Sequence, residues 1–291
     1  MEATKERNKR CARHDSGLFI KQKGMIMMSI RISSTDQQAS GGFDEGKLVE
    51  QKPIGFPGEG SAVDRVGTLF YWAWFQAKED AYLPPHPHRG FEIISYLLNG
   101  TVHHQDTLGN ERSLHTGGLQ VMQTGSGVQH SEKYKEGTSG FQIWFEPFMG
   151  ESNYVTPTYA DYEDHELPVV VTDGVTVKTI VGENSPVHLV ADSKMWDVII
   201  PAGHKFERDI PKSYSIAGLV VEGQSDWHFE SETRSVDTKE FVVCEATTPS
   251  ALKIEASAND DTRLILIQVP SVLPYPSYKE VKLRVKLKKD E

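Results

Sequence analysis

The feature that most constrains the fold is a series of short apolar runs separated by turn residues. From about residue 65, runs rich in Val, Ile, Phe, Tyr and Trp alternate with Gly, Pro, Asn and Asp. No long segment carries the 3.6-residue apolar period of an amphipathic helix. This spacing is typical of an all-β sandwich or barrel. The clearest predicted strands cover 68–75, 92–98, 119–123, 140–145, 175–181, 195–200, 216–221, 240–244 and 263–269.

Length and a weak internal repeat favour two such domains. A chain of 291 residues is comfortable for two domains of ordinary size. The segments 96–100 and 219–223 both read as a strand that ends at a turn glycine. We therefore predict a first barrel over 41–160 and a second over 161–291. Residues 1–40 carry no sustained period and are predicted to be a poorly ordered extension.

Charge and composition exclude several functions. Residues 1–23 carry +4 and residues 279–291 carry +3, so the net charge of −10 leaves −17 for the residues between. An acidic body repels nucleic acid phosphates. No apolar run approaches the roughly 20 residues of a membrane span, and no apolar segment follows the basic start as in a signal peptide. Two cysteines in distant segments fit a reducing compartment, so we expect a cytoplasmic protein without membrane or direct nucleic-acid partners.

The first motif that carries chemistry is Pro85-His86-Pro87-His88-Arg89-Gly90-Phe91-Glu92. In a strand, residues i and i+2 point to the same face. His86 and His88 can therefore present two imidazoles side by side. Pro87 between them offers no ladder donor, which favours an edge or rim strand.

A second pair follows about 40 residues later. His130 and Glu132 also stand at i and i+2, after a glycine-flanked turn at 125–127. Folded together, the two pairs would bring three imidazoles and one carboxylate to one point. Such a set suits Fe(II), Mn(II), Ni(II), Cu(II) or Zn(II), and the lack of a thiolate argues against a closed structural zinc site.

Two further residues compete for the same site. His103 and His104 are adjacent, so they face opposite sides of a strand and at most one can join the cluster. Glu92 lies four residues after His88, where strand alternation also allows an inward direction. Periodicity alone leaves both Glu132 and Glu92 open as the carboxylate.

The chain resembles the pirin family of the cupin superfamily. The resemblance rests on His86-Pro-His-Arg-Gly-Phe-Glu92, on the stretches 95–100 and 118–127, on His130-Ser-Glu132, and on Phe141-Gln-Ile-Trp144. It extends over about residues 43–148. It implies two tandem cupin (jelly-roll-like) β-barrels with one iron ion in the first and none in the second. Family relatives often carry Gly-Asp before Leu-Gln; Gly117-Gly118 stands there instead, which we interpret as turn chemistry.

The resemblance also implies which residues bind the metal. Residue by residue, the ligands of the family match His86, His88, His130 and Glu132, so the resemblance favours Glu132 over Glu92. We expect Fe(II), with Mn, Ni, Cu or Zn as alternatives. In the second half, the positions 123 residues after these ligands hold Asp209, Pro211, Lys253 and Glu255, without a neighbouring histidine pair.

Two functions follow from the resemblance. The first is a metal-dependent dioxygenase of the quercetin 2,3-dioxygenase type, which would act on a small phenolic substrate, a flavonol-like enediol, and O₂. Glu132 would be its catalytic base, and cavity walls are expected from Phe91, Tyr96, Leu119, Met122, Phe141 and Trp144. The alternative is a non-catalytic, redox-sensitive regulator that binds a transcription factor or a metabolic enzyme. A sugar- or acid-binding cupin or an isomerase is a third class.

Overall fold

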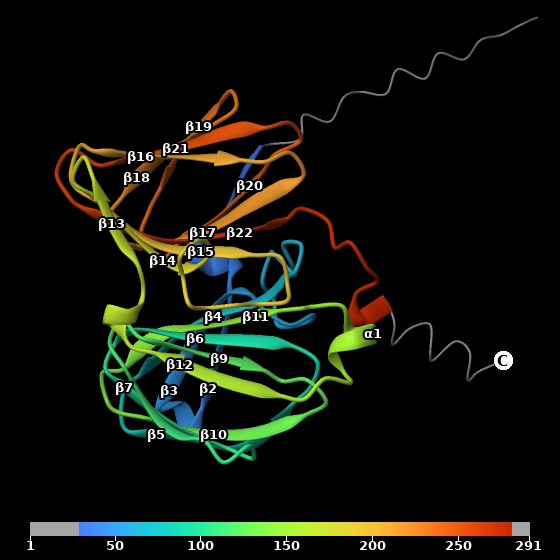
Figure 1. Ribbon diagram of the computed structural model, residues 1–291. Helices are drawn as coiled ribbons and strands as arrows, with labels where there is room; N and C mark the ends of the chain where they lie inside the picture. The colour runs from blue at the N-terminus through green and yellow to red at the C-terminus, as the bar shows by residue number, and fades with distance from the viewer. Residues whose placement is uncertain (1–28, 281–291) are drawn as a thin grey trace, which may run out of the picture.

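The computed structural model describes residues 29–280. Its strands form four layers, with two seven-stranded sheets stacked in the middle and one four-stranded sheet on each outer side (Figure 1). Each seven-stranded sheet and its four-stranded partner enclose one domain. The fold is therefore two tandem β-barrels of the cupin type, as the sequence predicts.

The N-terminal domain contains sheets of order β12-β9-β6-β11-β4-β3-β2 and β5-β10-β7-β8. All neighbouring strands in both sheets are antiparallel. The strands are β2 (Ala39–Phe43), β3 (Leu48–Ile54), β4 (Leu69–Ala77), β5 (Ala81–His88), β6 (Glu92–Asn99), β7 (Thr101–Asp106), β8 (Glu111–His115), β9 (Leu119–Gln123), β10 (Val128–Tyr134), β11 (Ser139–Phe145) and β12 (Thr158–Tyr162).

The C-terminal domain repeats this plan with orders β1-β20-β17-β22-β15-β14-β13 and β16-β21-β18-β19. Its strands are β1 (Ile30–Ser33), β13 (Val169–Thr172), β14 (Val175–Val181), β15 (Lys194–Ile200), β16 (Lys205–Ile210), β17 (Tyr214–Glu222), β18 (Ser225–Phe229), β19 (Glu232–Val236), β20 (Phe241–Glu245), β21 (Ser250–Ala256) and β22 (Thr262–Pro270). Helical turns are brief: α1 (Met149–Ser152), η1 (Thr35–Gln37), η2 (Asp44–Gly46) and η3 (Asp164–Glu166). No helix in the described part of the chain is long and apolar enough to cross a membrane.

The internal repeat in the sequence corresponds to equivalent strands. β6 and β17 hold the same place in the two seven-stranded sheets, and each ends before a glycine with positive φ, Gly100 at 89° and Gly223 at 77°. A Cβ on either glycine would lie within 2.4 Å of an atom of a neighbouring segment, Thr138 for Gly100 and Asp261 for Gly223. Only glycine combines this backbone conformation with such a close approach.

The N-terminal segment departs from the prediction. Residues 30–33 form β1, which pairs with β20 in the C-terminal domain. β1 there holds the sheet position that β12 holds in the N-terminal domain. The extension predicted over 1–40 therefore does not hold for the described residues 29–40, and residues 1–28 lie outside the described part of the chain. β12 likewise runs past the predicted boundary at residue 160.

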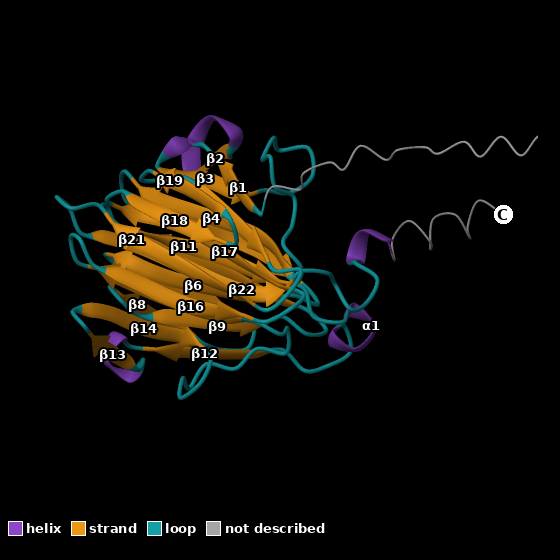
Figure 2. Ribbon diagram, turned by 90° about the horizontal axis from the view of Figure 1, so that it is seen from above, coloured by secondary structure: helices purple, strands orange, loops and turns teal. Residues whose placement is uncertain are grey.

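The C-terminal segment crosses in the other direction. After β22 the chain returns to the N-terminal domain, where the Tyr275 hydroxyl donates a hydrogen bond to the carbonyl oxygen of Glu146 at 2.6 Å. The backbone N–H of Tyr278 donates to the Glu146 side chain. This segment and α1 lie together at one end of the stacked sheets (Figure 2). Both ends of the described chain thus contact the domain to which they are not adjacent in sequence.

The two seven-stranded sheets bury one continuous apolar core between them. Trp72 and Phe241, one from each domain, meet edge to face with centroids 5.5 Å apart. The Tyr96 hydroxyl donates to Asp197 across the same interface at 2.7 Å. The outward faces of β4, β6 and β11 are buried in this interface. The opposite faces of these strands therefore line the interior of the first barrel.

Candidate metal centre

Adjacent strands of the outer sheet bring the two predicted ligand pairs together. β5 and β10 are antiparallel, and His86 lies directly opposite His130. Along β10, residues Val128, His130, Glu132 and Tyr134 are buried while Gln129 and Lys133 are exposed. The period of two therefore places His130 and Glu132 on the inner face, as predicted.

The proline-rich sequence of β5 fits its position. β5 is the edge strand of its sheet, where prolines cost no ladder hydrogen bond on the open side. The register with β10 shifts between His86 and Leu83, because two residues of β10 oppose three of β5. Pro84 and Pro85 occupy this bulge, which turns the histidine pair into the barrel.

The three imidazoles have the spacing of ligands around one ion. Donor atoms of His86, His88 and His130 all lie within 4.8 Å of one another. The Nε2 atoms of His88 and His130 are 3.0 Å apart. Nitrogen ligands at about 2.0–2.1 Å from an ion and at right angles to each other are separated by about 3 Å. The donor set and its spacing fit one first-row divalent metal ion.

Neighbouring groups fix the tautomers of two of these histidines. Nδ1 of His86 lies 2.9 Å from the carbonyl oxygen of Pro84. A carbonyl only accepts, so Nδ1 carries the proton and Nε2 keeps its lone pair. Such contacts to the second ring nitrogen are the usual way to orient a metal-binding histidine.

His130 is oriented by a chain of two further residues. Nε2 of His104 lies 3.1 Å from Asp106 Oδ2, and Nδ1 of His104 lies 3.5 Å from Nδ1 of His130. The Asp106 carboxylate accepts the His104 proton, so His104 Nδ1 accepts from His130 and leaves His130 Nε2 with a free lone pair. The ring of His104 is stacked on Tyr159 at 4.5 Å.

Strand alternation decides the roles of the two adjacent histidines. His104 is buried and His103 is exposed, where His103 contacts Ser113 instead. The sequence predicted that at most one of them could join the cluster. It did not identify His104-x-Asp106 as a unit, although the i,i+2 spacing was the available signal.

Burial favours the neutral forms of His88 and His130. Burial, followed by the nearby positive charges of His130 and His86, lowers the pKa of His88 to about 3. Burial and the charges of His86 and His104 lower the pKa of His130 to about 3. Neutral imidazoles with directed lone pairs are what metal binding requires. Hydrogen bonds from Asn110, His104 and the backbone of Leu108 outweigh desolvation and lower the pKa of Asp106.

Glu132 belongs to a second, overlapping cluster. Its carboxylate groups with His104 and His130, whereas His86 and His88 group with His130. Gln120 donates to Glu132 Oε1 at 3.1 Å and the Tyr134 hydroxyl donates to Oε2 at 2.7 Å. Glu132 is buried and lies directly opposite His104 on β7. It is therefore adjacent to the three-histidine cluster and held by hydrogen bonds.

The alternative carboxylate points away from the cluster. Glu92 accepts hydrogen bonds from Gln123 and from the backbone N–H groups of Val190 and Ala191 in the C-terminal domain. Counting alternation from His88 fails because the chain turns at Gly90, with φ of 81°, between the end of β5 and the start of β6. Glu92 therefore shares its face with Ile94 and Tyr96, toward the other domain.

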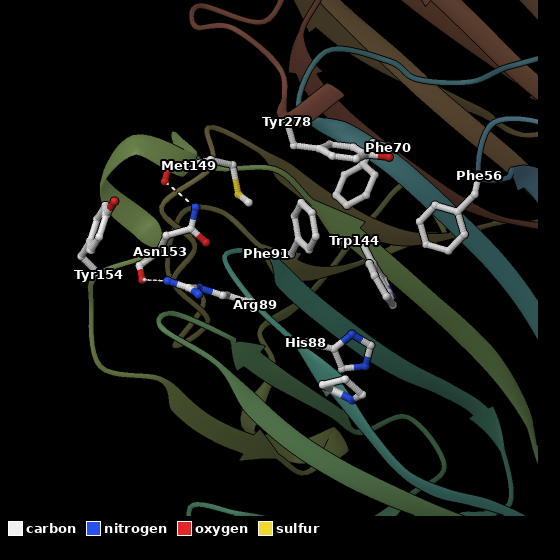
Figure 3. Close-up of a pocket in the computed structure, with 11 residues that line it drawn as sticks. Phe56, Phe70, His88, Arg89, Phe91, Trp144, Met149, Asn153, Tyr154 and Tyr278 are labelled. Atoms are coloured by element: carbon white, nitrogen blue, oxygen red, sulfur yellow. Dashed lines mark hydrogen bonds between the residues drawn. The ribbon is translucent and has the colours of Figure 1, made fainter. Parts of the chain in front are cut away.

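An aromatic cavity of about 590 Å³ opens beside His88. Figure 3 shows His88 below Trp144, with Phe91, Phe70 and Tyr278 around the space above it. Trp144 contacts the His88 ring edge to face at 4.8 Å. Of the expected wall residues, Phe91, Met122 and Trp144 lie in or beside the interior cluster. Tyr96, Leu119 and Phe141 instead lie in the core between the domains.

A second cavity of about 360 Å³ adjoins the first. It shares Phe56, His88 and Trp144 with the larger cavity. Its wall also includes His86, together with Glu50 from β3 and Tyr71 from β4. No motif in the sequence pointed to Glu50, because its strand was not recognised and the histidines that share its cavity lie in another sheet.

Tandem cupin-type barrels with a histidine cluster inside the first define a bicupin. Residues 68–145 match the family model described as Pirin. Pirin-like protein 2 of Arabidopsis thaliana is 31% identical over 167 residues, which cover 55% of this chain and 52% of that protein. Over this part of its length the chain is similar to the pirin family. It spans about half the length of the curated relatives that it matches.

Solved structures with the same fold cover nearly the whole chain. The nickel(II) complex of the bacterial pirin YhhW from Escherichia coli has a TM-score of 0.68 at 21% identity and covers 84% of this chain and 100% of that chain. A quercetin 2,3-dioxygenase from Acinetobacter baumannii has a TM-score of 0.71 at 20% identity and covers 90% of this chain and 88% of that chain. At these identities the likeness shows that the fold is shared and nothing further.

Proposed function

We propose that this protein is a metal-dependent dioxygenase of the quercetin 2,3-dioxygenase type that acts on a flavonol-like enediol and O₂. The observation that carries the proposal is the position of His88, which lines both cavities with aromatic walls. His86 lines the smaller cavity, and His130 lies 3.0 Å from His88 between their Nε2 atoms. A planar phenolic molecule fits such walls, because aromatic faces bind flat rings by stacking and edge contacts.

The proposed ligands are His86, His88, His130 and Glu132, and the proposed ion is Fe(II). When bound, the ion would act as a Lewis acid that stabilises the deprotonated hydroxyl of the substrate. The histidine set equally suits Mn, Ni, Cu or Zn. The nickel(II) complex of the structural relative YhhW supports a site of this breadth in the family.

We assign the role of general base to Glu132. Its buried carboxylate lies beside His130 and is oriented by Gln120 and Tyr134. In this role it would accept the proton of the substrate hydroxyl. Trp144 and Phe91 would keep the ring against His88 and exclude water from the reacting atoms.

Oxygen uptake tests the proposal. The protein as purified should contain one metal ion per chain, and should consume O₂ when quercetin is added. Glu132→Gln should keep most of the metal but lose turnover by about 10²–10⁴-fold, because the amide is a far poorer base. His86→Ala should lose both the metal and the turnover. His103→Ala, an exposed neighbour on β7, is the matched control and should behave as wild type.

Two outcomes would reject the proposal. Two bound ions, or full metal content in a His86→Ala/His88→Ala variant, would contradict the ligand set. Flat oxygen traces with full metal content in the wild type would contradict the dioxygenase. The second outcome would favour the redox-sensitive regulator, whose partner binding should then depend on the oxidation state of the metal.

A further inference from the structure

The smaller cavity places a second polar group opposite the histidines. Glu50 and Tyr71 come from the seven-stranded sheet, whereas His86 and His88 come from the four-stranded sheet across the barrel. On β3, Leu48, Glu50 and Lys52 are buried while Val49 and Gln51 between them are only partly buried. The period of two therefore directs Glu50 into the barrel.

The Glu50 carboxylate is buried but weakly bonded. Its residue is 8% exposed, and the Tyr71 hydroxyl reaches both carboxylate oxygens only at 3.4 Å. Lys52 lies 3.9 Å from Glu50 but 2.8 Å from Glu59, so its hydrogen bond goes to Glu59. A carboxylate accepts up to about four hydrogen bonds, and contacts near 3.4 Å are at the weak end of the range.

A buried carboxylate with only weak hydrogen bonds destabilises the fold unless a ligand supplies the missing hydrogen bonds. Burial raises the pKa of Glu50 to about 7, against the lowering effects of Lys52 and Tyr71. Buried polar groups are normally well hydrogen-bonded, and those that are not are concentrated at functional sites. Much of the remaining cavity wall is apolar, with Leu48, Phe75 and Leu83, and its other polar side chains include Tyr134 and Gln142. A hydrogen-bond donor on an otherwise apolar ring is the complementary ligand.

We propose that Glu50, assisted by Tyr71, recognises a ring hydroxyl of the aromatic substrate at the end of the smaller cavity away from the histidines. This inference rests on the proposed function, because it assumes that the enediol lies at the metal. Glu50 is then a specificity-determining residue that selects polyhydroxylated rings. An unsubstituted ring would leave the buried carboxylate unpaired, and sites built to bind a hydroxyl reject ligands that lack it.

Equilibrium binding without oxygen tests this role apart from turnover. The protein as purified, with its metal content measured, is titrated anaerobically with quercetin and with 3-hydroxyflavone. Both carry the enediol with its 3-hydroxyl, but 3-hydroxyflavone lacks the hydroxyls that quercetin carries on its two benzene rings. Wild type should bind quercetin about 10- to 100-fold more tightly. Glu50→Leu should abolish most of this preference while it leaves 3-hydroxyflavone binding and metal content nearly unchanged.

Two other variants complete the experiment. Tyr71→Phe preserves the shape of the wall and should reduce the preference for quercetin by a smaller factor, which keeps the test valid if Glu50→Leu does not fold. Glu45→Gln removes one negative charge from an exposed position of the same domain and should keep the full preference.

The outcomes separate the two proposals. An unchanged preference in both Glu50→Leu and Tyr71→Phe, or no preference in wild type, would overturn the role of Glu50. If neither flavonol binds the metal-containing protein, both proposals fall. If the preference depends on Glu50 but oxygen is not consumed, the recognition role stands and the dioxygenase does not.

Discussion

The metal centre depends on proton positions at single residues. Each ring nitrogen that faces away from the cluster in His86 and His130 has an identified partner: Pro84 for the first and His104 for the second. Because Asp106 accepts from His104, the series Asp106, His104, His130 has one consistent arrangement of protons when both imidazoles are neutral. The lone pair of His130 Nε2 is thereby directed toward His88, 3.0 Å away.

Removing His104 should weaken metal binding without removing a proposed histidine ligand. Loss of a partner that orients a ligand typically lowers metal affinity by about 10- to 100-fold, so we expect a change of this size for His104→Ala. Metal affinity is measured by competition with a chelator. His103→Ala is the matched control, since its side chain is exposed on the opposite face. Equal affinities in the two variants would show that His104 does not orient His130.

Glu50 should make the metal-free protein less stable at higher pH. Burial raises its pKa from the ordinary value of 4.5 to about 7 in the fold. Between these values the folded protein holds a proton that the unfolded chain releases, so stability falls as the pH rises through this window. The shift corresponds to about 3 kcal/mol.

The difference between wild type and Glu50→Gln isolates this effect. The groups around Glu50, namely Lys52, Glu59, Tyr71 and Glu132, are common to both proteins. Urea denaturation of chelator-treated protein measures the free energy of unfolding of both proteins. The value for Glu50→Gln relative to that for wild type should rise by up to about 3 kcal/mol between pH 4.5 and pH 8. A constant difference over this range would contradict the raised pKa.

At the scale of elements, two edge strands distinguish this chain: β5, which contains two of the proposed ligands, and β1, which completes the second domain. β5 places two of the proposed ligands at a sheet edge, where its prolines and its bulge are tolerated. β1 is also an edge strand, and it completes the second domain from the opposite end of the chain. Its side chain Ile30 is fully buried in the C-terminal core, so this short strand contributes to packing as well as to pairing.

Truncating Ile30 should destabilise the protein although it lies in a four-residue strand. Deleting a buried isoleucine side chain to alanine typically costs about 2–5 kcal/mol. Arg31→Ala is the control, because Arg31 is exposed on the other face of β1 and such changes usually stay within about 0.5 kcal/mol. Urea denaturation measures both. Similar midpoints for the two variants would mean that β1 does not pack as described.

At the scale of the whole molecule, the two barrels share one core. The core between the domains includes Trp72, Ile94 and Phe141 from the first domain and Leu219, Phe241 and Ile267 from the second. Each barrel alone would expose its half of this surface. β1 and the segment 271–280 further tie each domain to the opposite end of the chain. The second barrel thus covers the outer face of the sheet whose inner face lines the site.

We therefore expect the two domains to unfold together. Phe241→Ala, a change within the C-terminal domain, should cost about 3–5 kcal/mol and should lower the urea midpoint of the whole protein. Tryptophan fluorescence and far-UV circular dichroism should give coincident transitions. Val190→Ala, at a side chain that is 74% exposed, is the control. Two resolved transitions would indicate domains that are stable independently.

The sequence by itself determined the features that depend on local period. Alternation within one strand placed His130 and Glu132 on a common face, paired His86 with His88, and separated His103 from His104. Short runs between turn residues determined the all-β class, and the glycines after β6 and β17 marked the repeat of the two barrels. These features are local, since neighbouring residues in a strand fix the direction of each side chain.

Only the tertiary structure decided the features that depend on which segments meet. The turn at Gly90 ended the alternation that allowed Glu92 into the site, and placed its carboxylate against backbone groups nearly 100 residues away. β1 pairs with β20, which lies more than 200 residues further along the chain. Glu50 reached the histidines only because two sheets close around one cavity. Strand register, sheet order and barrel closure are set by packing between distant segments, and no local pattern records them.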